Sequence, residues 1–416
     1  MAVFKPFKAV RPVPEKAAHI ASLPYDVMDS DEARVEVAKY PLSFLHVEKP
    51  EVDLPLGTDL YDPAVYAKAK ENLYAYMERG DMQQDTKPMF YIYKQVMDGR
   101  AQFGLVGLAS VDEYMNGIIK KHELTRAEKE ADRIKHVDTC DAHSSPVFFT
   151  YRHNAEIDEL VHRISGTTTA QYDFVTDDNI GHTLWLIDNV EDIATISRVF
   201  AEMDYLYVAD GHHRTASAAK VGLVRREQYP DYTGEEEFNF FMTVIFPDNQ
   251  LKIFDYNRVV KDLNGNSTEE YMAKVAEKFE IRPIHEDGPY HPAKLHEFGM
   301  YMDNTWYCLT PKSGTWNEQD VVENLDVSIL QRNLLHPILG IDDPRTDKRI
   351  DFIGGIRGLG ELEKRVDSGR EVVAFAMYPT SMDELIGIAD AGQIMPPKST
   401  WFEPKLRSGL FIHLLK

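Results

Sequence analysis

The sequence predicts an α/β protein with α+β elaborations, built around a mixed sheet. Segments rich in β-branched and aromatic residues alternate with segments of helical periodicity between residues 145 and 222, and again between residues 350 and 392. Two further runs of strand-like composition flank Asp98-Gly99, the strongest hairpin signal in the chain. The length of 416 residues predicts either two lobes or one elaborated α/β domain.

Residues 1–115 are expected to form a β-rich N-terminal segment. The first sixty residues are rich in proline and turn residues, which favours short strands and extended loops over helices. Asp62 and Pro63 then predict the N-cap and the first position of a helix that ends at Gly80. The hairpin at Asp98-Gly99 completes this segment.

Residues 116–260 are expected to form a central α/β segment. It begins with a short strand, 117–123. Thr125 and Glu128 then match a T-x-x-E capping box, which predicts the start of a helix over 126–138.

The rest of the central segment alternates strands with helices. The last such pair is a strand at 205–209 followed by a helix at 213–221, with Gly222 as the expected C-cap. A hairpin turned at Pro247-Asp248-Asn249 is predicted over residues 237–260.

Residues 261–416 are expected to form a C-terminal α/β segment with a basic tail loop. Ser267 and Glu270 form a second capping box. Asp326 is expected to start an amphipathic helix over 326–340, after which strands and helices alternate again. The tail ends in a strand-like run.

The charge balance argues against nucleic acid as a partner. The chain carries 46 basic and 68 acidic residues, a formal net charge of −22, and such a protein repels phosphate backbones at long range. Local basic sites are therefore the more informative places in this sequence.

Cysteine usage and hydropathy predict a cytoplasmic protein without a membrane partner. Cys140 and Cys308 lie far apart and belong to no C-x-x-C pair, so neither a disulfide framework nor a zinc ribbon is expected. The first twenty residues contain no continuous apolar run of the signal-peptide type, and no stretch reaches the apolar length of a bilayer span.

The sequence YLYVADGHHRTASAAKVG, residues 205–222, places chemical groups at a strand-to-helix corner. The first turn of a helix has unpaired N–H groups and a positive partial charge, and both favour a phosphate. Gly211 permits a close backbone approach, Arg214 offers a planar cationic fork, and His212 and His213 can donate hydrogen bonds or shuttle protons. Asp210 could hold a metal ion, orient a histidine or act as a base.

The corner yields one set of site predictions. The candidate catalytic residues here are Asp210 and His213, and the candidate phosphate-binding residues are Gly211, His212, Arg214 and Thr215. For any single residue the alternative is an ordinary Asp-Gly turn, with Asp210 as a helix cap and the histidines at the surface.

A second cluster lies in KKHELTRAEKEADR. Glu123 precedes the predicted capped helix and is a candidate general base. Arg126, Lys129 and Arg133 follow at spacings that place them on one helical face, where they could bind a phosphorylated substrate. The alternative is a solvated, salt-bridged helix face, because Glu and Asp are interleaved with these cations.

A third cluster lies in the tail sequence PPKSTWFEPKLRSGL. Cations alternate there with hydroxyl groups, which predicts an anion-binding loop formed by Lys398, Ser399, Thr400, Lys405 and Arg407. No G-x-x-x-x-G-K-[ST] motif precedes the hydroxyl pair, so the loop is not a P-loop. A basic surface tail is the alternative.

Several motifs in chain order resemble the bacterial family named domain of unknown function 1015: LPYDV, FLHVEKPE, HELTRAEKEADRIKH, SPVFF, ADGHHRTASA and PPKSTWFEPKLRSGL. The DGHHR box also resembles the phosphate-binding box of the ParB/sulfiredoxin-like superfamily, which includes free serine kinases. This resemblance implies a ParB/sulfiredoxin-like core with additional N- and C-terminal segments.

The resemblance implies a small-molecule phosphotransferase, most directly a free L-serine kinase that uses pyrophosphate or a nucleotide as donor. Asp210, His212, His213 and Arg214 would surround the transferred phosphate, and Glu123 would deprotonate the serine hydroxyl. Mg²⁺ is the expected cofactor, bridging phosphate oxygens and held by Asp210. The partners expected are thus an amino acid and a phosphoryl donor.

Two other functions stay open at this point. The same anion pocket could hydrolyse a phosphorylated small molecule, with water as the acceptor. A non-catalytic, ParB-like nucleotide-binding module is the second alternative, although the charge of −22 speaks against a role on DNA.

Overall fold

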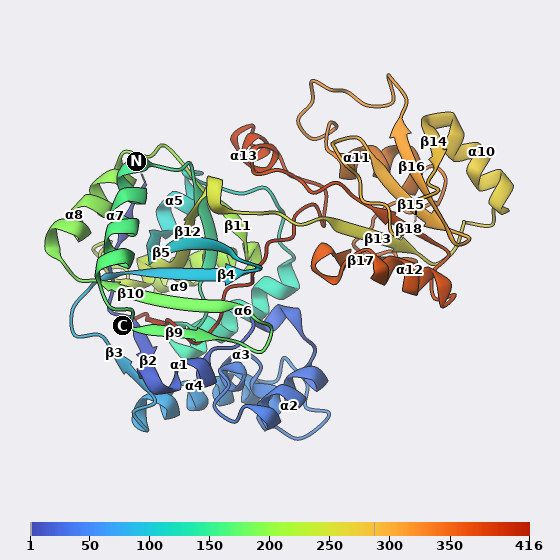
Figure 1. Ribbon diagram of the computed structural model, residues 1–416. Coiled ribbons are helices and arrows are strands. Elements are labelled where there is room, and N and C mark those ends of the chain that lie inside the picture. Colours follow the sequence, from blue (N-terminus) through green and yellow to red (C-terminus); the bar gives the residue numbers. More distant parts are fainter. Residues whose placement is uncertain (1, 287) are drawn as a thin grey trace. The chain divides into compact units, whose positions relative to one another are not determined.

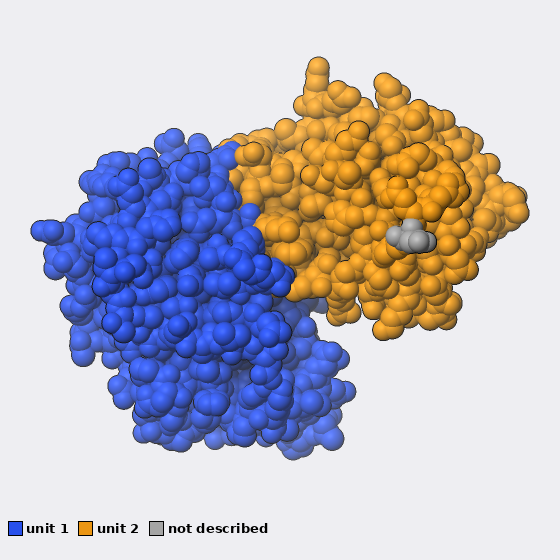
Figure 2. Space-filling view, in the orientation of Figure 1, with its two compact units in different colours: residues 1–251, 404–416 blue, residues 252–403 orange. Residues whose placement is uncertain are grey.

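A computed structural model describes residues 2–286 and 288–416 (Figure 1). The chain forms two compact units (Figure 2): unit 1 comprises Met1–Leu251 and Pro404–Lys416, and unit 2 comprises Lys252–Glu403. These boundaries differ from the three segments expected from the sequence. The reason is pairing between distant strands, which unites the first two segments in one sheet and returns the last residues of the chain to unit 1.

Unit 1 is built on a nine-stranded mixed sheet, which confirms the predicted fold class. The strand order is β6-β11-β8-β12-β5-β4-β10-β9, and β1 pairs with β5. The β11–β6 and β12–β8 pairs are parallel and the other pairs are antiparallel. The strands are β1 Phe4–Lys5, β4 Phe90–Met97, β5 Arg100–Ser110, β6 Ile119–Lys120, β8 Val147–Tyr151, β9 Tyr172–Val175, β10 Gly181–Ile187, β11 Leu206–Asp210 and β12 Phe240–Pro247.

Two small sheets complete the strands of unit 1. β2 (Val10–Pro12) pairs with β3 (Met82–Gln84), and β7 (Ala142–His143) pairs with β19 (His413–Leu414). The second pair holds the returning end of the chain, because His143 lies opposite His413 in its register.

The helices of unit 1 surround the large sheet and supply most of the site described below. Side chains of α7, α8 and α9 join those of the central strands in one apolar core, and α6 packs against α9. The α-helices are α1 Ala17–Ile20, α2 Ser30–Lys39, α3 Leu45–Glu48, α4 Pro63–Glu78, α5 Val111–Met115, α6 Ala127–Cys140, α7 Ala155–Thr167, α8 Val190–Ala201 and α9 His212–Gln228, and the 3₁₀ turns are Pro14–Lys16, Tyr25–Val27, η3 Pro50–Asp53, η4 Glu237–Asn239 and Asp248–Gln250.

Unit 2 has a six-stranded antiparallel sheet of its own, in the order β14-β16-β15-β18-β13-β17. Its core includes Tyr271 and Val275 of α10, which stand one helical turn apart and face the sheet. The elements are β13 Tyr256–Val260, α10 Thr268–Lys278, β14 Phe279–Pro283, β15 Phe298–Met302, β16 Thr305–Pro311, α11 Asp326–Leu330, a π-helical turn Gln331–Leu335, β17 Ile350–Gly354, a 3₁₀ turn Gly355–Arg357, α12 Gly360–Asp367, β18 Val373–Ala376 and α13 Met382–Asp390.

The elements with strong local signals are confirmed. Asp98 and Gly99 both have positive φ, as a two-residue hairpin between β4 and β5 requires. Asp62 caps α4 by accepting from the N–H of Ala64. Ser267 and Glu270 form the predicted capping box of α10.

Several local predictions are wrong. The first sixty residues contain the helices α1, α2 and α3, and α2 begins at a capping box between Asp29 and Glu32 that proline content alone concealed. Gly222 lies inside α9 and does not end it. A Cβ at position 222 would lie 2.6 Å from the carbonyl oxygen of Phe238, so glycine lets the helix approach that segment closely.

The predicted hairpin over 237–260 is also absent. β12 pairs with β5 and β8 of unit 1, whereas β13 pairs with β17 and β18 of unit 2. The two strands therefore belong to different sheets.

Among the described residues, no helix combines the length and the apolarity needed to cross a bilayer.

Candidate functional site

The corner between strand and helix lies in unit 1, where the sequence predicts it. β11 ends at Asp210, Gly211 adopts a φ of +81°, and α9 begins at His212. A Cβ at position 211 would lie 3.2 Å from Arg214 Nη2. Glycine therefore serves both the left-handed backbone and the close approach of the guanidinium group.

Asp210 is held between two donors. Its Oδ2 accepts from Lys405 Nζ at 3.0 Å, and its Oδ1 accepts from the N–H of Gly211 at 2.7 Å. Burial opposes the negative charge, but Lys405 and Arg214 outweigh it and hold the pKa of the Asp210 carboxyl well below its usual range. The structure thus joins the corner to one cation of the predicted tail loop.

The side chain of His212 is buried behind the corner. Its Nδ1 lies 3.7 Å from Glu123 Oε2, and its ring packs edge-on against that of His122 with 4.4 Å between centroids. Burial and the neighbouring His122 lower the pKa of His212 well below the ordinary value, and burial lowers the pKa of His122 to about 4. Both rings are therefore neutral at physiological pH, and Glu123 stands beside one of them.

His213 and Thr215 have different surroundings. The half-buried His213 accepts at Nδ1 from the N–H of Arg126 at 3.4 Å, and burial together with Lys129 lowers its pKa. The Thr215 hydroxyl is buried and donates to the carbonyl oxygen of Gly211 at 3.1 Å. Thr215 therefore supports the first turn of α9, while His213 faces the start of α6.

The predicted second cluster is only partly on one helical face. α6 begins at Ala127, and Arg126 is its N-cap with extended backbone, so the shared face applies to Lys129 and Arg133 alone. The Thr125–Glu128 capping box is wrong, because the Thr125 hydroxyl donates to the Glu130 carboxylate instead.

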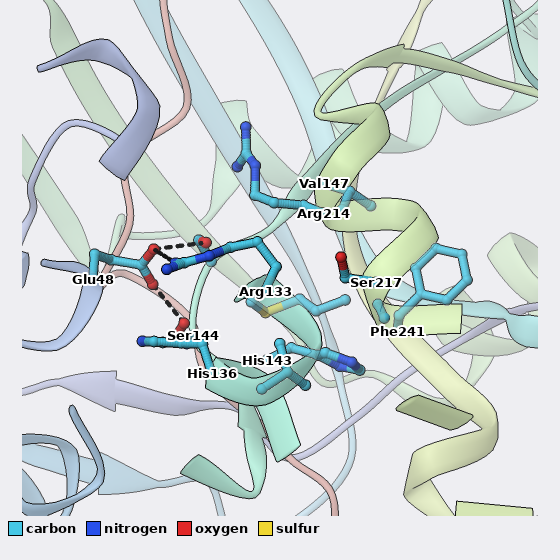
Figure 3. Close-up of a pocket in the computed structure, with 13 residues that line it drawn as sticks. Glu48, Arg133, His136, His143, Ser144, Val147, Arg214, Ser217 and Phe241 are labelled. Carbon is cyan, nitrogen blue, oxygen red and sulfur yellow. Dashed lines mark hydrogen bonds and ion pairs between the residues drawn. The ribbon is translucent and has the colours of Figure 1, made fainter. Parts of the chain in front are cut away.

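A pocket adjoins the corner along the flank of α9 (Figure 3). Its cavity volume is about 20 Å³, which is close to the space of one water molecule. All the residues that line it belong to unit 1: Glu48, Arg133, His136, Val137, His143, Ser144, Ser145, Val147, Arg214, Ser217, Ala218, Phe241 and Met242.

Two guanidinium groups approach this pocket. Arg214 Nη1 donates to the carbonyl oxygen of Pro146 at 2.7 Å, and Arg214 Nε is buried with no hydrogen-bond partner among the described residues. Burial opposes the charge on Arg214, but Asp26 and Asp210 raise its pKa above the ordinary value. The guanidinium of Arg133 lies 4.1 Å from the ring centroid of Tyr25, and Asp132 likewise outweighs burial and raises its pKa.

Glu48 is the carboxylate of the pocket. Its Oε1 accepts from Ser144 Oγ at 2.5 Å and its Oε2 accepts from Ser145 Oγ at 3.4 Å, while Arg133 Nη1 lies 4.0 Å from Oε2 (Figure 3). The pocket therefore presents donors from the arginines and acceptors from Glu48 to the same small space.

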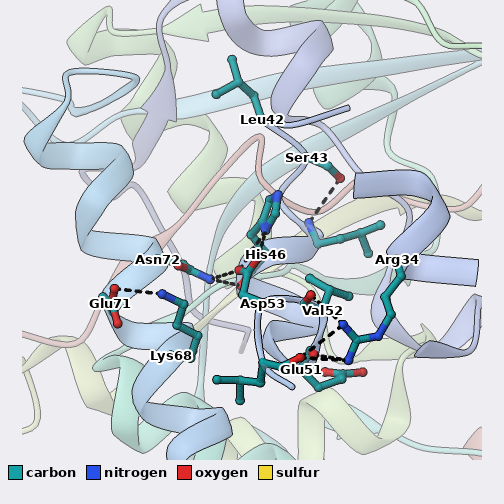
Figure 4. A network of polar contacts seen from close by, with 12 residues as sticks. Arg34, Leu42, Ser43, His46, Glu51, Val52, Asp53, Lys68, Glu71 and Asn72 are labelled. Carbon is teal, nitrogen blue, oxygen red and sulfur yellow. Dashed lines mark hydrogen bonds and ion pairs between the residues drawn. The ribbon is translucent and has the colours of Figure 1, made fainter. Parts of the chain in front are cut away.

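A network of polar contacts fixes the segment that carries Glu48 (Figure 4). Arg34 donates to the carbonyl oxygens of Glu51 and Val52 at 2.6 and 2.8 Å. Asp53 accepts from Asn72 Nδ2 at 2.7 Å and lies 2.9 Å from His46 Nδ1. These contacts tie α3 and η3 to α2 and α4.

The remaining tail residues are divided between the units. Arg407 is buried in unit 1, where it pairs with Asp178 and donates to Thr176 Oγ1 at 3.1 Å. Lys398, Ser399 and Thr400 lie in unit 2. Arg258 donates to the carbonyl oxygen of Lys398 at 2.9 Å, and Ser399 donates to that of Pro396 at 2.6 Å. Anion binding by these residues stays a prediction.

The donor set at the corner does not build a resident Mg²⁺ site. In the described parts of the chain, no three His, Cys, Asp or Glu side chains gather closely enough to hold a metal ion. Asp210 is a single carboxylate whose two oxygens already accept from Gly211 and Lys405.

Sequence reasoning missed the pocket side of this site. Glu48, His143 and Ser144 were not among the predicted residues, although Glu48 lies in FLHVEKPE, one of the motifs that carry the family resemblance. The family motif therefore included Glu48, but the sequence alone did not show that this carboxylate lines a pocket.

Solved structures similar to this chain include a free serine kinase in complex with AMP, with 13% identity and a TM-score of 0.37, covering 71% of this chain and 86% of that one. A conserved hypothetical protein from Pyrococcus furiosus has 14% identity and a TM-score of 0.36, with 74% and 94% covered. SbnI with C-terminal truncation from Staphylococcus aureus has 12% identity and a TM-score of 0.39, with 74% and 87% covered. No curated protein matches the chain.

A family model described as "Protein of unknown function (DUF1015)" matches residues 4–328. This match spans most of the 416 residues and includes the corner and every residue of the pocket. The chain therefore belongs to the DUF1015 family.

Proposed function

We propose that this protein is a small-molecule phosphotransferase that moves a phosphoryl group from pyrophosphate or a nucleotide to the hydroxyl of a free amino acid, with L-serine as the acceptor. The observation that carries the proposal is the buried Arg214 Nε, which has no hydrogen-bond partner among the described residues and belongs to a side chain that lines a pocket. A buried guanidinium donor without a partner costs stability unless a ligand engages it.

The charges of the pocket support an anionic ligand. Arg133 and Arg214 give the lining two positive charges against the one carboxylate of Glu48, in a chain whose net charge is −22. Guanidinium groups bind phosphate oxygens through paired hydrogen bonds. Among the lining residues alone, the two guanidinium groups outnumber the one carboxylate, which favours an oxyanion over a cation as ligand, while Asp132 pairs with Arg133 from outside the lining.

The roles follow from position. Arg214 and Arg133 would bind the transferred phosphoryl group, with support from the N-terminal turn of α9. Asp210 and Lys405 would hold the strand-to-helix corner beside these arginines. His213 would donate a hydrogen bond at the edge of this corner. Glu48, with Ser144 and Ser145, would bind the acceptor.

Glu123 stays the sequence-based proposal for the base that deprotonates the hydroxyl. Its carboxylate lies beside His212, and it is not one of the residues that line the pocket. Comparing Glu123→Gln with Glu48→Gln in the same assay tests this role. A larger loss of kcat in Glu48→Gln would contradict the assignment to Glu123.

We propose further that Mg²⁺ enters with the donor and is not a resident ion, because phosphate oxygens and water commonly supply most of its ligands. Removing divalent ions with EDTA is then expected to stop transfer without lowering the melting temperature of the ligand-free protein. A lower melting temperature after EDTA would contradict entry with the donor.

The function is tested by ³¹P NMR of the purified protein with pyrophosphate, ADP or ATP, each with and without L-serine. O-phosphoserine formation with one of these donors is the expected result. Arg214→Ala and Asp210→Asn are expected to abolish it with the fold retained, whereas Arg226→Ala, an arginine of the same helix that pairs with Asp112, is the matched control.

Two results would overturn the proposal. Full transfer by Arg214→Ala would remove the pocket from the reaction. Donor cleavage at the same rate with and without serine, yielding only inorganic phosphate, would establish a hydrolase in place of a phosphotransferase.

A further inference from the structure

A chain of three side chains leads from the pocket toward the surface of unit 1. His143 lies on β7, opposite His413 on β19. The Nδ1 atoms of these two rings are 3.1 Å apart, and His413 Nε2 lies 2.7 Å from Glu237 Oε2. His143 lines the pocket at one end, while the Glu237 side chain is 47% exposed at the other.

The contacts of His413 determine which nitrogen atoms carry protons. A carboxylate only accepts hydrogen bonds, so His413 Nε2 carries the hydrogen that faces Glu237. In a neutral His413 ring, Nδ1 is then an acceptor, and the proton of this short contact belongs to His143 Nδ1. His143 Nε2 is left with a free lone pair.

His143, which carries this free nitrogen, stands at the pocket end of the three side chains. In the part of the chain that the structure describes, His143 Nε2 is buried and has no hydrogen-bond partner. Burial, followed by the nearby His413 and Arg225, lowers the pKa of His143 well below its ordinary value. The charged groups around it are Arg225 of α9 and the pocket residues Glu48 and Arg133.

Glu237, at the other end of the three side chains, is exposed to solvent. Glu237 is one of the residues that line a surface hollow, together with Tyr229, Tyr232 and Phe238. A proton that reaches Glu237 can therefore pass to water.

We propose that His143, His413 and Glu237, in place of the sequence-based candidate Glu123, form a proton relay that removes the proton of the acceptor hydroxyl during phosphoryl transfer. As the acceptor oxygen bonds to phosphorus and the donor oxygen leaves with the electrons of the broken P–O bond, the hydroxyl proton moves to His143 Nε2. The Nδ1 proton of His143 moves to His413 Nδ1, and the Nε2 proton of His413 moves to Glu237. The relay rests on the proposed function for its substrate, while its protonation pattern does not.

The neighbouring Glu48 is less available for this step. Its two carboxylate oxygens already accept from Ser144 and Ser145, whereas His143 Nε2 has an unused lone pair. In Ser–His–carboxylate enzymes a carboxylate likewise fixes the tautomer of a histidine ring, but it is not itself protonated there, whereas in this relay Glu237 receives the proton.

The first experiment is independent of activity. Long-range ¹H–¹⁵N NMR of the full-length protein with labelled histidines reports which ring nitrogens carry protons. The expected result is a proton on Nδ1 of His143 and on Nε2 of His413, with the His143 signals assigned from His143→Gln. A proton on His143 Nε2 in the neutral protein would overturn the relay, whatever the protein transfers.

The second experiment uses the donor and acceptor established by the ³¹P assay. His143→Gln is expected to lower kcat by about 100-fold or more, with a small change in KM for the acceptor, because a general base acts on the chemical step. Glu237→Gln is expected to lower kcat by about 10-fold, less than the 10²–10⁴-fold range typical of the base itself, because Glu237 does not touch the acceptor. Glu235→Gln, which alters an exposed carboxylate paired with Lys5 in the same region, is the matched control.

Chemical rescue separates a proton-transfer role from a structural one. His143→Gly leaves space beside the pocket, and added imidazole is expected to restore kcat in proportion to the concentration of its neutral form. Unchanged kcat in His143→Gln, or loss of activity without any rescue in a folded His143→Gly protein, would overturn the relay. Absence of transfer by the unaltered protein with every donor would instead overturn the proposed function and leave the NMR result to decide the protonation pattern.

Discussion

Lys405 Nζ lies 3.0 Å from Asp210 Oδ2, although 195 residues separate the two in the sequence. The ion pair attaches the returning stretch of unit 1 to the end of β11, at the corner that precedes α9. It therefore contributes both to the stability of unit 1 and to the shape of the candidate site.

Asp210→Asn is expected to lower the free energy of unfolding in a pH-dependent way. Because Lys405 and Arg214 depress the folded-state pKa of Asp210 against the effect of burial, its carboxylate contributes stability that is present above the unfolded pKa near 4 and is lost as the pH falls. The side chain is 34% exposed, so we expect a loss of about 1 kcal/mol at pH 7. Urea denaturation at pH 7 and pH 3 measures it, and an equal loss at both values would contradict the prediction.

Arg34→Met is expected to loosen the segment that carries Glu48. The guanidinium group donates to the carbonyl oxygens of Glu51 and Val52, and hydrogen bonds to a charged group contribute about 1.5–3 kcal/mol. Amide hydrogen exchange over residues 45–53 should quicken, and kcat/KM for the transfer reaction should fall. Arg163→Met, at an exposed pair with Asp192, should change neither. Unaltered exchange in Arg34→Met would show that other contacts hold the segment.

Glu113→Gln is expected to stabilise the protein at alkaline pH. Burial raises the pKa of Glu113 to about 7, against the N–H of Val3, which donates to its Oε1 at 2.7 Å. A folded-state pKa above the unfolded value means that stability is full below about pH 4.5 and declines as the pH rises to about 7. The variant should remove this decline, a gain of about 3 kcal/mol at pH 8 relative to pH 4.5. Thermal unfolding of the variant and of the unaltered protein at these two pH values checks the prediction. An equal difference in melting temperature at both pH values would contradict it.

Gly222→Ala and Gly166→Ala are expected to act in opposite directions, although both glycines lie in helices. At position 222 the new Cβ would lie 2.6 Å from the carbonyl oxygen of Phe238, a clash that we expect to cost about 1–3 kcal/mol. At position 166 in α7 nothing lies within 4 Å of the new Cβ, so the better helix propensity of alanine should add about 0.5–1 kcal/mol. Chemical denaturation of the two variants tests the pair, and a stabilised Gly222→Ala would show that the Phe238 segment can move.

The sequence predicted those elements whose causes are local. The hairpin at Asp98-Gly99 and the start of α4 follow from the residues at the turn and the cap themselves. The capping box predicted at Thr125 failed because the Thr125 hydroxyl donates its hydrogen bond to Glu130, which lies more than one helical turn from the expected cap. This competing hydrogen bond depends on tertiary packing, which the hydrophobic periodicity of the sequence does not specify.

The residues of the candidate site divide in the same way, into those that local sequence predicts and those that only tertiary packing brings together. Asp210, Gly211 and Arg214 were predicted because one short stretch contains them all. Glu48 and His143 meet Arg214 only after helices α3, α6 and α9 and strand β7 have packed together. The division of strands β12 and β13 between two sheets was unpredictable for the same reason, since strand composition does not specify a partner.

The return of Pro404–Lys416 to unit 1 has a consequence for biosynthesis. A ribosome releases these residues after the whole of unit 2, so unit 1 must wait for Lys405 and His413 while unit 2 folds. During that interval Asp210 and His143 lack their partners, and the nascent chain exposes an unfinished edge at β7. Assembly of the corner at Asp210 is thereby delayed until unit 2 has been synthesised, which makes chaperone dependence of unit 1 an expected property of the living cell.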